Sequence, residues 1–285
     1  MRKLFGAVAV MALAACNQAK PDNDSNAATA NAAAASGAEL SLTRLDCGRA
    51  DFKDMNAFFS DRPGVYPPGA GKVTDSCYLI RHSDKQMIWD TGLPAGTKNE
   101  AMEGGMTASV DVSLADQLKQ LGLKPEDIDI VGISHMHSDH TGQAAQFVKA
   151  DLIIGRADFD QTKGDKDPFQ PWRQAKAGAI TFVSGESDVF GDGSVKVLHL
   201  PGHTPDHLAL LVNLKSGPVL LTGDLYHSTI AREKRSLPPF NTSRKQTLQS
   251  MDKFEALAKQ LGAKVIIQHE PNDIAKLPAF PQAAQ

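Results

Sequence analysis

The stretch His135-Met136-His137-Ser138-Asp139-His140 places four strong metal ligands within six positions, directly after the largely apolar run 128–133. In an extended segment, residues two apart point to the same side, so His135 and His137 can converge on one ion. A turn after them would direct Asp139 and His140 toward a second ion. The alternative is a polar loop rich in histidine, which is disfavoured because further ligands occur elsewhere in the chain.

Three other apolar runs each lead into a residue that commonly binds metals. They lie at 195–200, 219–221 and 265–267, and lead into His203, Asp224 and His269. The carboxyl ends of buried strands are the edge where open α/β sheets usually build their sites, and Gly202 and Gly223 allow tight turns there. Imidazole and carboxylate ligands suit zinc. Together with the first motif, the runs predict seven ligands: His135, His137, Asp139, His140, His203, Asp224 and His269.

The rest of the pattern is that of one large α/β domain over residues 39–285. Ser113 is a candidate N-cap for a helix over 113–121, and 247–261 carries apolar side chains on one face of a long helix that Gly262 ends. In addition to the ligand-bearing runs, strands are expected at 40–45, 77–82, 86–89, 152–155 and 180–183.

Charge is nearly balanced, with 30 Lys and Arg against 33 Asp and Glu and a net charge of −3. A nucleic-acid-binding domain usually carries a strongly basic patch, so no nucleic-acid partner is expected. The short cluster Arg232, Lys234 and Arg235 is interpreted as a solvated surface.

Residues 1–15 have the pattern of a signal peptide, because Arg2 and Lys3 precede an apolar stretch too short to span a bilayer as a mature helix. The segment Leu13-Ala14-Ala15-Cys16 resembles the lipobox of bacterial lipoproteins, which implies a lipid anchor on Cys16. Asn17 then favours the outer membrane, facing the periplasm. Residues 16–38 have almost no large apolar side chains and are expected to form a flexible tether. The alternative is an ordinary cleaved signal peptide.

Cys47 and Cys77 form the remaining pair of cysteines. In an oxidising periplasm they could form a disulfide. Both lie on expected strands, where cysteine often acts as a small buried hydrophobe. We therefore expect two free buried thiols.

These motifs resemble the metallo-β-lactamase superfamily, whose signature is His-x-His-x-Asp-His followed by a distant His, Asp and His. The similarity runs from about residue 40 to 278 and includes Trp89-Asp90-Thr91-Gly92. It implies an αββα sandwich, in which two mixed β-sheets are flanked by helices, and two Zn²⁺ ions, with Co²⁺ or Mn²⁺ as alternatives. In the implied arrangement the first ion is held by His135, His137 and His203, the second by Asp139, His140 and His269, and Asp224 bridges both.

Segments around the ligands are similar to the N-acyl homoserine lactonases, the quorum-quenching family. These segments are Asp46-Cys47-Gly48, Cys77-Tyr78-Leu79-Ile80, Pro201-Gly202-His203-Thr204-Pro205 and Gly223-Asp224-Leu225-Tyr226-His227. Some lactonases place a substrate-contacting Tyr three residues after the bridging Asp. Here Tyr226 is two residues after it and His227 is three after it, so either of the pair could contact the substrate.

The resemblance implies hydrolysis of the lactone ring of N-acyl homoserine lactones. Two metal ions about 3.5–4 Å apart lower the pKa of bound water toward ~7, so that hydroxide attacks the lactone carbonyl. Tyr226 or His227 would donate a hydrogen bond to the developing oxyanion. Asp139 would pass the proton to the leaving alkoxide.

Other residues have candidate roles around this centre. Asp90 could orient a ligand histidine or simply form a turn, while His199 and His207 are expected to make structural hydrogen bonds. Several apolar residues in expected loops could receive the acyl chain, or could equally be ordinary packing. These residues are Phe58, Phe59, Tyr66, Met102, Met106 and Phe240.

Other functions fit parts of the pattern. A periplasmic β-lactamase would share the attack on a cyclic carbonyl, but dizinc β-lactamases of this superfamily usually lack a bridging Asp such as Asp224. A thioester hydrolase of the glyoxalase II type carries that Asp but normally adds a C-terminal helical region, and sixteen residues follow His269. A non-enzymatic metal-binding module would be expected to have lost ligands. A diiron oxidoreductase usually has Glu where His137 stands.

Overall fold

The computed structural model describes residues 39–102, 105–164 and 166–285. The predicted signal peptide at 1–15, the predicted lipid attachment at Cys16 and the tether up to residue 38 lie outside the described residues. None of the helices in the described ranges is long and apolar enough to cross a membrane.

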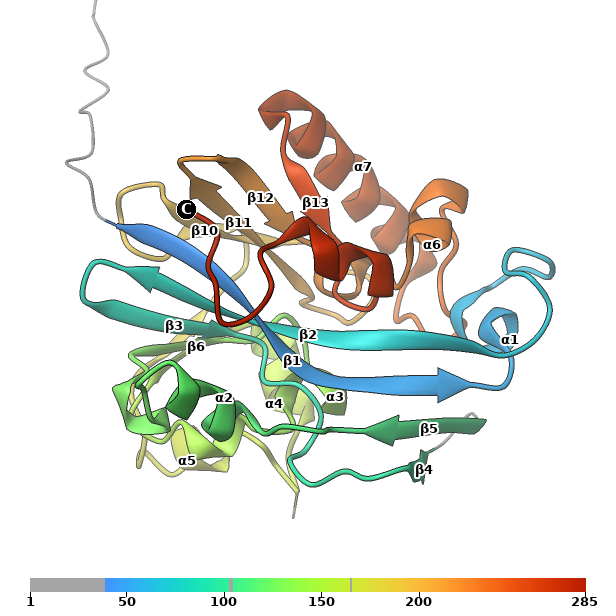
Figure 1. Cartoon of the computed structure of the whole chain (residues 1–285). Helices are drawn as coiled ribbons and strands as arrows, with labels where there is room; N and C mark the ends of the chain where they lie inside the picture. Colours follow the sequence, from blue (N-terminus) through green and yellow to red (C-terminus); the bar gives the residue numbers. More distant parts are fainter. Residues whose placement is uncertain (1–38, 103–104, 165) are drawn as a thin grey trace, which may run out of the picture. The chain divides into compact units, whose positions relative to one another are not determined.

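Two mixed β-sheets lie face to face in the described part of the chain (Figure 1). The larger contains β1 (Leu40–Phe52), β2 (Gly71–His82), β3 (Lys85–Trp89), β4 (Glu100–Met102), β5 (Met106–Ser109), β6 (Ile130–Gly132), β7 (Asp151–Ile154) and β8 (Ile180–Phe182). The smaller contains β9 (Glu186–Asp188), β10 (Val195–His199), β11 (Leu208–Leu214), β12 (Gly217–Leu221) and β13 (Lys264–Ile266). Their strand orders are β4-β5-β1-β2-β3-β6-β7-β8 and β13-β12-β11-β10-β9. All the strands expected from the sequence are present, but β1 and β2 are considerably longer than predicted.

Helices cover the outer face of each sheet (Figure 1). Those of the described residues are α1 (Met55–Phe59), α2 (Leu114–Gln120), α3 (Ser138–Thr141), α4 (Arg156–Gln161), α5 (Gln170–Arg173), α6 (Thr229–Lys234) and α7 (Arg244–Leu261). Helices α2, α4 and α5 pack on the larger sheet, and α7 packs on the smaller. The predicted αββα sandwich is confirmed.

The strands bury side chains on both faces, since successive residues point to opposite sides. On β2, Tyr78 and Ile80 pack between the sheets, whereas Leu79 faces the helices on the outside. The apolar face of α7, with Met251 and Phe254, packs on the smaller sheet. This double burial explains why the strand sequences are nearly continuous apolar runs.

The two helices predicted in detail have the expected ends. The Ser113 side chain accepts a hydrogen bond from the backbone N–H of Asp116 and caps α2. Gly262 ends α7 with a φ of 60°, in the left-handed region that glycine adopts most readily. α7 begins at Arg244, somewhat earlier than predicted, because Ser243 caps it there.

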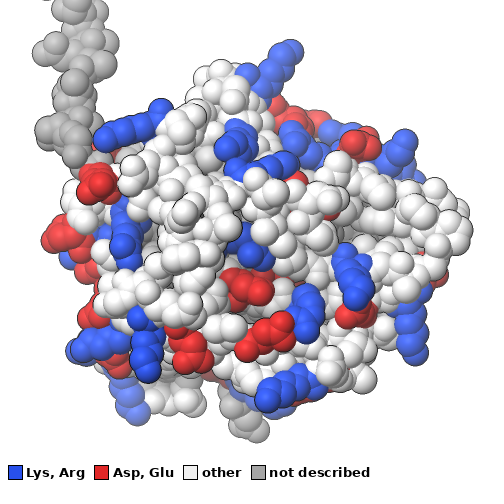
Figure 2. Space-filling view, in the orientation of Figure 1, with Lys and Arg blue, Asp and Glu red and all other residues white. Residues whose placement is uncertain are grey.

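Acidic and basic side chains are interspersed on the face shown in Figure 2. The predicted solvated cluster is partly paired. Arg232 forms a two-pronged ion pair with Glu255 at 2.8 Å, and Arg235 contacts Asp252 at 2.9 Å.

Candidate metal centre

All seven predicted ligands meet where strand ends of both sheets come together. His135 and His137 follow β6, and Asp139 and His140 lie in the short helix α3. The other three ligands, His203, Asp224 and His269, follow β10, β12 and β13. Their ligand atoms form two groups: His135, His137, His203 and Asp224, and beside them Asp139, His140 and His269.

The first group consists of three closely spaced imidazoles. His137 Nδ1 lies 3.0 Å from His135 Nε2 and 3.2 Å from His203 Nε2. Burial lowers the pKa of His135 well below its ordinary value and that of His137 to about 4, and neighbouring histidines add to the effect. Neutral rings with converging lone pairs are the form of histidine that binds metals.

Asp224 lies between the two groups. One carboxylate oxygen, Oδ2, is 3.4 Å from His203 Nε2. The other, Oδ1, is 3.2 Å from His140 Nε2 and 3.0 Å from His269 Nε2. The carboxylate therefore faces the first group with one oxygen and the second with the other, as a bridging ligand must.

The donor set fits a pair of divalent cations. Buried His140 Nε2 and Asp224 Oδ1 have no hydrogen-bond partner among the described residues. A buried polar atom without a partner is costly, and the cost is removed when the atom binds an ion. Nitrogen and carboxylate ligands in two adjacent groups are typical of zinc and similar metals.

The outer nitrogens of several ligand rings are held by hydrogen bonds. His140 Nδ1 contacts Asp90 Oδ2 at 3.0 Å, and His269 Nδ1 contacts the carbonyl of Thr74 at 2.9 Å. His203 Nδ1 contacts Asn241 Oδ1 at 2.9 Å. Each bond leaves Nε2 directed at the centre, which is how metal-binding histidines are usually oriented. Of the two roles predicted for Asp90, the contact with His140 is the geometry expected of an orienting residue.

His199 and His207, for which structural hydrogen bonds were predicted, make such bonds. His207 is fully buried, and its Nδ1 lies 3.1 Å from the carbonyl of Leu200, while its Nε2 accepts the backbone N–H of Asp224 at 2.9 Å. His199 contacts Asp206 at 3.0 Å. His207 thus holds the turn that presents Asp224 to the centre.

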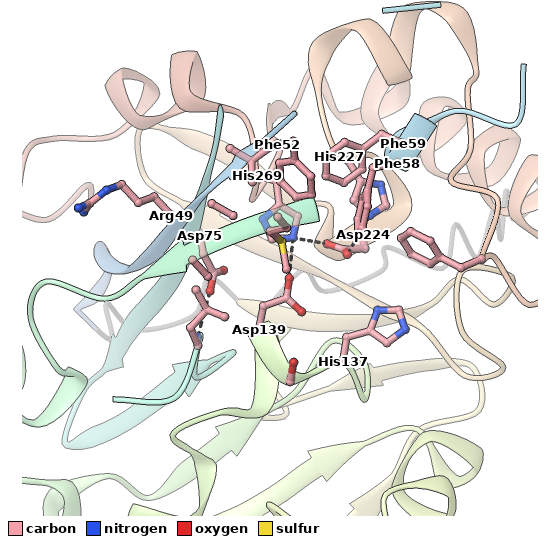
Figure 3. Close-up of a pocket in the computed structure, with 17 residues that line it drawn as sticks. Arg49, Phe52, Phe58, Phe59, Asp75, His137, Asp139, Asp224, His227 and His269 are labelled. Carbon is pink, nitrogen blue, oxygen red and sulfur yellow. Dashed lines mark hydrogen bonds and ion pairs between the residues drawn. The ribbon is translucent and has the colours of Figure 1, made fainter. Parts of the chain in front are cut away.

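A cavity of about 570 Å³ opens on the metal centre (Figure 3). Such a volume is typical of small-molecule sites. At the metal end its wall includes His137, Asp139, Asp224, His227 and His269. The rest of the wall is largely apolar and includes Phe52, Phe58, Phe59, Val73, Leu93, Met106, Ala108 and Phe240.

Four of the residues predicted as candidates for the acyl chain line this cavity: Phe58, Phe59, Met106 and Phe240. Tyr66 does not, because its hydroxyl is hydrogen-bonded to Ser228 at 2.9 Å. The side chain of Met102 lies outside the described part of the structure. Sequence reasoning missed Phe52, since β1 extends seven residues beyond the predicted 40–45 strand and carries Phe52 to the cavity.

Tyr226 and His227 point in opposite directions. Tyr226 is buried against Phe254, and its hydroxyl donates to Glu255 at 2.9 Å. His227 lines the cavity, with Nε2 at 3.0 Å from Asp224 Oδ2. Tyr226 has an extended backbone, so adjacent side chains lie on opposite sides. The structure therefore places His227, and not Tyr226, at the cavity wall, so His227 is the candidate for contact with substrate.

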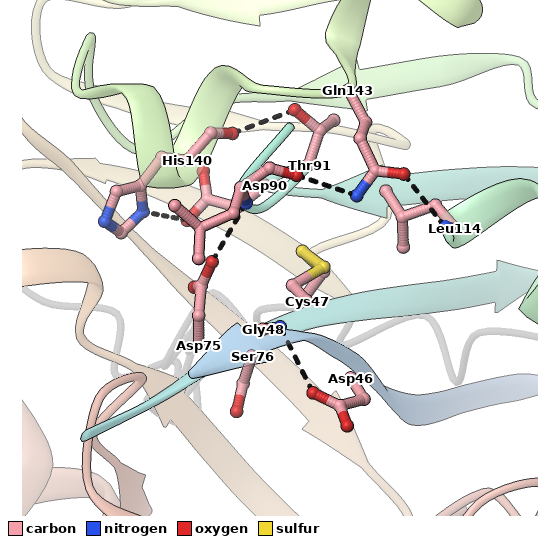
Figure 4. The surroundings of a disulfide bond; sticks show 12 residues. Asp46, Cys47, Gly48, Asp75, Ser76, Asp90, Thr91, Leu114, His140 and Gln143 are labelled. Carbon is pink, nitrogen blue, oxygen red and sulfur yellow. Dashed lines mark hydrogen bonds and ion pairs between the residues drawn. A yellow bond between two sulfur atoms is a disulfide. The ribbon is translucent and has the colours of Figure 1, made fainter. Parts of the chain in front are cut away.

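Cys47 and Cys77 form a disulfide, contrary to the predicted free thiols (Figure 4). Their Cα atoms are 5.7 Å apart, within the usual range for a disulfide. A bulge in β1 between Asp46 and Gly48 lets Cys47 bond to a neighbouring strand. The sequence shows neither the strand pairing nor the bulge, so the distance could not be predicted.

One buried carboxylate beside the centre was not singled out from the sequence. Asp75 lies on β2 and lines the cavity. Burial raises the pKa of Asp75 to about 7, although the nearby His269 and His140 favour its charged form. No local motif marks this residue, because it follows the ordinary strand residues Val73 and Thr74.

Comparisons of the chain with family models and with known proteins agree on one family. The family model described as the metallo-beta-lactamase superfamily matches residues 70–269. The chain is 32% identical over 218 residues to the N-acyl homoserine lactonase AttM of Rhizobium johnstonii, covering 68% of this chain and 81% of that protein. It is also 32% identical over 229 residues to the AttM lactonase of Agrobacterium fabrum, covering 72% and 85%.

Solved structures with the same fold include an N-acyl homoserine lactone hydrolase with the product N-hexanoyl-L-homoserine bound at its catalytic metal centre. The TM-score is 0.72 at 21% identity, covering 85% of this chain and 98% of the other. The dizinc quorum-quenching lactonase AidC gives a TM-score of 0.63 at 17% identity, covering 86% and 90%. At these identities the likeness shows the fold.

Proposed function

Because the chain belongs to the metallo-β-lactamase superfamily, we propose that it is a dizinc hydrolase that opens the lactone ring of N-acyl homoserine lactones. The observation that carries the proposal is Asp224, which faces two ligand groups at the end of a largely apolar cavity. Relatives at 32% identity that are named N-acyl homoserine lactonases support the choice of substrate.

Each of the two ligand groups would hold one metal ion. His135, His137 and His203 would hold one ion and Asp139, His140 and His269 the other, and Asp224, which faces both groups, would contribute to each. When bound, the two ions supply Lewis-acid polarisation and a nucleophile derived from water near neutral pH. Buried ligands with fixed outer nitrogens present the ions in a rigid arrangement.

Side chains at the cavity wall then act on the substrate. Asp139 is 37% exposed, unlike the other members of its group, so its free oxygen can take the proton of the attacking water. It delivers that proton to the ring oxygen as the C–O bond breaks, and the new hydroxyl stays tethered in the product. His227 borders the same space and donates a hydrogen bond to the carbonyl oxygen as negative charge develops there.

The apolar part of the cavity suits the acyl chain. Phe58 on α1 and Phe240 have ring centroids 5.2 Å apart, and Phe240 lies 6.0 Å from His137. The two rings therefore form an apolar wall next to the metal centre. An acyl chain leaving the lactone can bury its methylenes against this wall.

A side-by-side hydrolysis assay tests the function. Zinc-loaded protein is given N-hexanoyl homoserine lactone, a β-lactam and a glutathione thioester, and we expect the lactone to have the highest kcat/KM. Asp224→Ala should lose both metal and activity, whereas Asp129→Asn, at a surface ion pair with Lys85, should keep both. A wide preference for the β-lactam or the thioester would refute the proposal.

We also propose that the protein is exported and lipid-anchored at Cys16, facing the periplasm from the outer membrane. The lipobox-like segment ending at Cys16 supports this, and the disulfide between Cys47 and Cys77 is typical of an oxidising compartment. Cys16→Ser should abolish lipid labelling and move the protein out of the membrane fraction. Unchanged partitioning of that variant would refute the anchor and leave the enzymatic proposal intact.

A further inference from the structure

Asp75 is an acidic side chain in the cavity wall that neither the ligand groups nor the proposed proton transfers use. It lies on β2, and the whole residue is 3% exposed. Figure 3 shows Asp75 among the residues that line the cavity, together with Asp139. The lining of the same cavity includes the apolar residues Val73, Leu93 and Ala108, while His269 and His140 lie near the Asp75 carboxylate. A charged group in such surroundings is costly unless it has hydrogen-bond donors.

The donors that the protein supplies to Asp75 are few. Oδ2 accepts the backbone N–H of Leu93 at 3.2 Å, and Oδ1 has the Gln268 amide nitrogen at 3.5 Å, the limit of a hydrogen bond. A carboxylate can accept about four hydrogen bonds, so acceptor capacity remains. In either protonation state, the Asp75 carboxyl group keeps an oxygen that can accept a hydrogen bond.

Asp75 has no ion-pair partner within the described ranges. Arg49, which also lines the cavity, is paired with Asp111. Arg44, which contacts the neighbouring Ser76 and Thr74, donates to their hydroxyls. The unused acceptor of Asp75 therefore faces a space that only a ligand or water can fill.

The contacts around Asp75 indicate which part of the substrate it would meet. The preceding residue, Thr74, accepts a hydrogen bond from the ring of His269, and Gln268 is adjacent to that ligand in sequence. Asp75 thus lies between the metal end of the cavity and the apolar wall. In an N-acyl homoserine lactone, the amide N–H lies between the ring and the acyl chain.

We propose that Asp75 accepts the hydrogen bond of this amide N–H and makes the site selective for lactones that carry a donor on the carbon next to the lactone carbonyl. The inference rests on the proposed lactonase function. It assigns to the chain a specificity-determining residue that acts on the substrate and not on the metals. A site with a buried acceptor discriminates against ligands without the donor, since the acceptor is then left unpaired.

The test compares two substrates that differ in one group. N-hexanoyl homoserine lactone is set beside its ester analogue, α-hexanoyloxy-γ-butyrolactone, in which oxygen replaces the N–H. Ring opening is followed by mass spectrometry, which separates it from cleavage of the exocyclic ester. The zinc-loaded parent should favour the amide by about tenfold or more in kcat/KM.

Two variants remove the acceptor. Asp75→Ala should lower kcat/KM for the amide by about tenfold or more and leave that for the ester within about twofold, so that the preference disappears. Asp75→Asn, which retains an oxygen for the Leu93 N–H, should act in the same direction and serves if the alanine variant does not fold. Asp129→Asn is the matched control and should keep the preference.

The outcomes separate the two proposals. Equal losses on both substrates would show that Asp75 only supports the structure, and the inference would be wrong. A parent that opens both lactones equally well would also overturn it while leaving the lactonase function intact. A parent that opens neither lactone would refute the lactonase function, and the role of Asp75 would fall with it.

Discussion

Replacing Asp90 by asparagine should weaken the second metal position without unfolding the domain. Asp90 is fully buried, and its two oxygens accept from the Ser134 N–H at 2.6 Å and contact His140 Nδ1 at 3.0 Å. Its φ is 58°, in the left-handed region that asparagine also tolerates, so Asp90→Asn adds no backbone strain.

The expected loss of metal affinity follows from the tautomer of His140. An Asn side chain can keep the bond to Ser134, but it then turns its NH₂ group toward His140 Nδ1. The ring would favour a proton on Nε2, the atom that faces Asp224 at 3.2 Å and must be free to bind metal. Loss of such an orienting partner typically costs 10–100-fold in metal affinity, or about 1.4–2.7 kcal/mol.

The assay is a competition of the protein against a chelator of known zinc affinity, with metal content checked by mass spectrometry. One ion should bind 10–100-fold more weakly in Asp90→Asn, and the other should be little affected. Asp129→Asn is the control, since it also changes a carboxylate that accepts a backbone N–H, at 2.8 Å from Gln86. If Asp90→Asn binds both ions as tightly as the parent, Asp90 does not set the tautomer.

Three further predictions concern side chains around the centre. Tyr226→Phe should lower the free energy of unfolding by about 1 kcal/mol through loss of the hydrogen bond to Glu255, and should leave lactone kcat/KM within about twofold. His227→Ala should lower kcat/KM by about tenfold or more at unchanged metal content, and equal kinetic losses in the two variants would contradict the opposite orientations of the side chains. Thiol titration of the unfolded protein should find Cys47 and Cys77 oxidised, and two titratable thiols in this pair would disprove the disulfide. Replacing both with alanine should lower the free energy of unfolding by about 3.5 kcal/mol, as their separation of 30 residues implies. The metal-free protein should lose stability as the pH falls from about 6.5 toward 4, because burial lowers the pKa of His137 to about 4 and that of His135 well below its ordinary value, so that the unfolded chain binds the extra protons in that window. Asp75, whose pKa burial raises to about 7, binds a proton in the folded state over the same window and offsets part of this loss. A melting temperature at pH 5 equal to that at pH 6.5 would contradict the prediction.

The ligand set could be predicted from the sequence because each ligand directly follows an apolar run. His203, Asp224 and His269 come from separate parts of the chain, but strands that are buried on both faces are easy to recognise. The ends of such strands meet at one edge of a sandwich. The short sequence pattern at each strand end therefore indicated that ligands from distant parts of the chain lie together.

Orientation and pairing could not be predicted in the same way. Tyr226 and His227 are adjacent in sequence, and only the backbone conformation after Asp224 decides which of them faces the cavity. The bond between Cys47 and Cys77 depends on a bulge next to Gly48 and on the pairing of β1 with β2, and the sequence does not give the register of that pairing. Asp75 is a single polar residue on a buried strand, and its position at the cavity depends on packing between distant segments.

The centre also connects the two sheets. His135 and His140 come from the segment after β6 of the larger sheet, whereas His203, Asp224 and His269 follow strands of the smaller sheet. Two ions held across this boundary bind only the folded arrangement, so their binding free energy adds to the stability of the sandwich. In their absence, His140 Nε2 and Asp224 Oδ1 stay buried without a hydrogen-bond partner among the described residues, and this cost opposes the same packing. Metal binding and the association of the sheets are therefore coupled in this fold, because polar atoms that are costly to bury without the ions become ligands that connect the two sheets when the ions are bound.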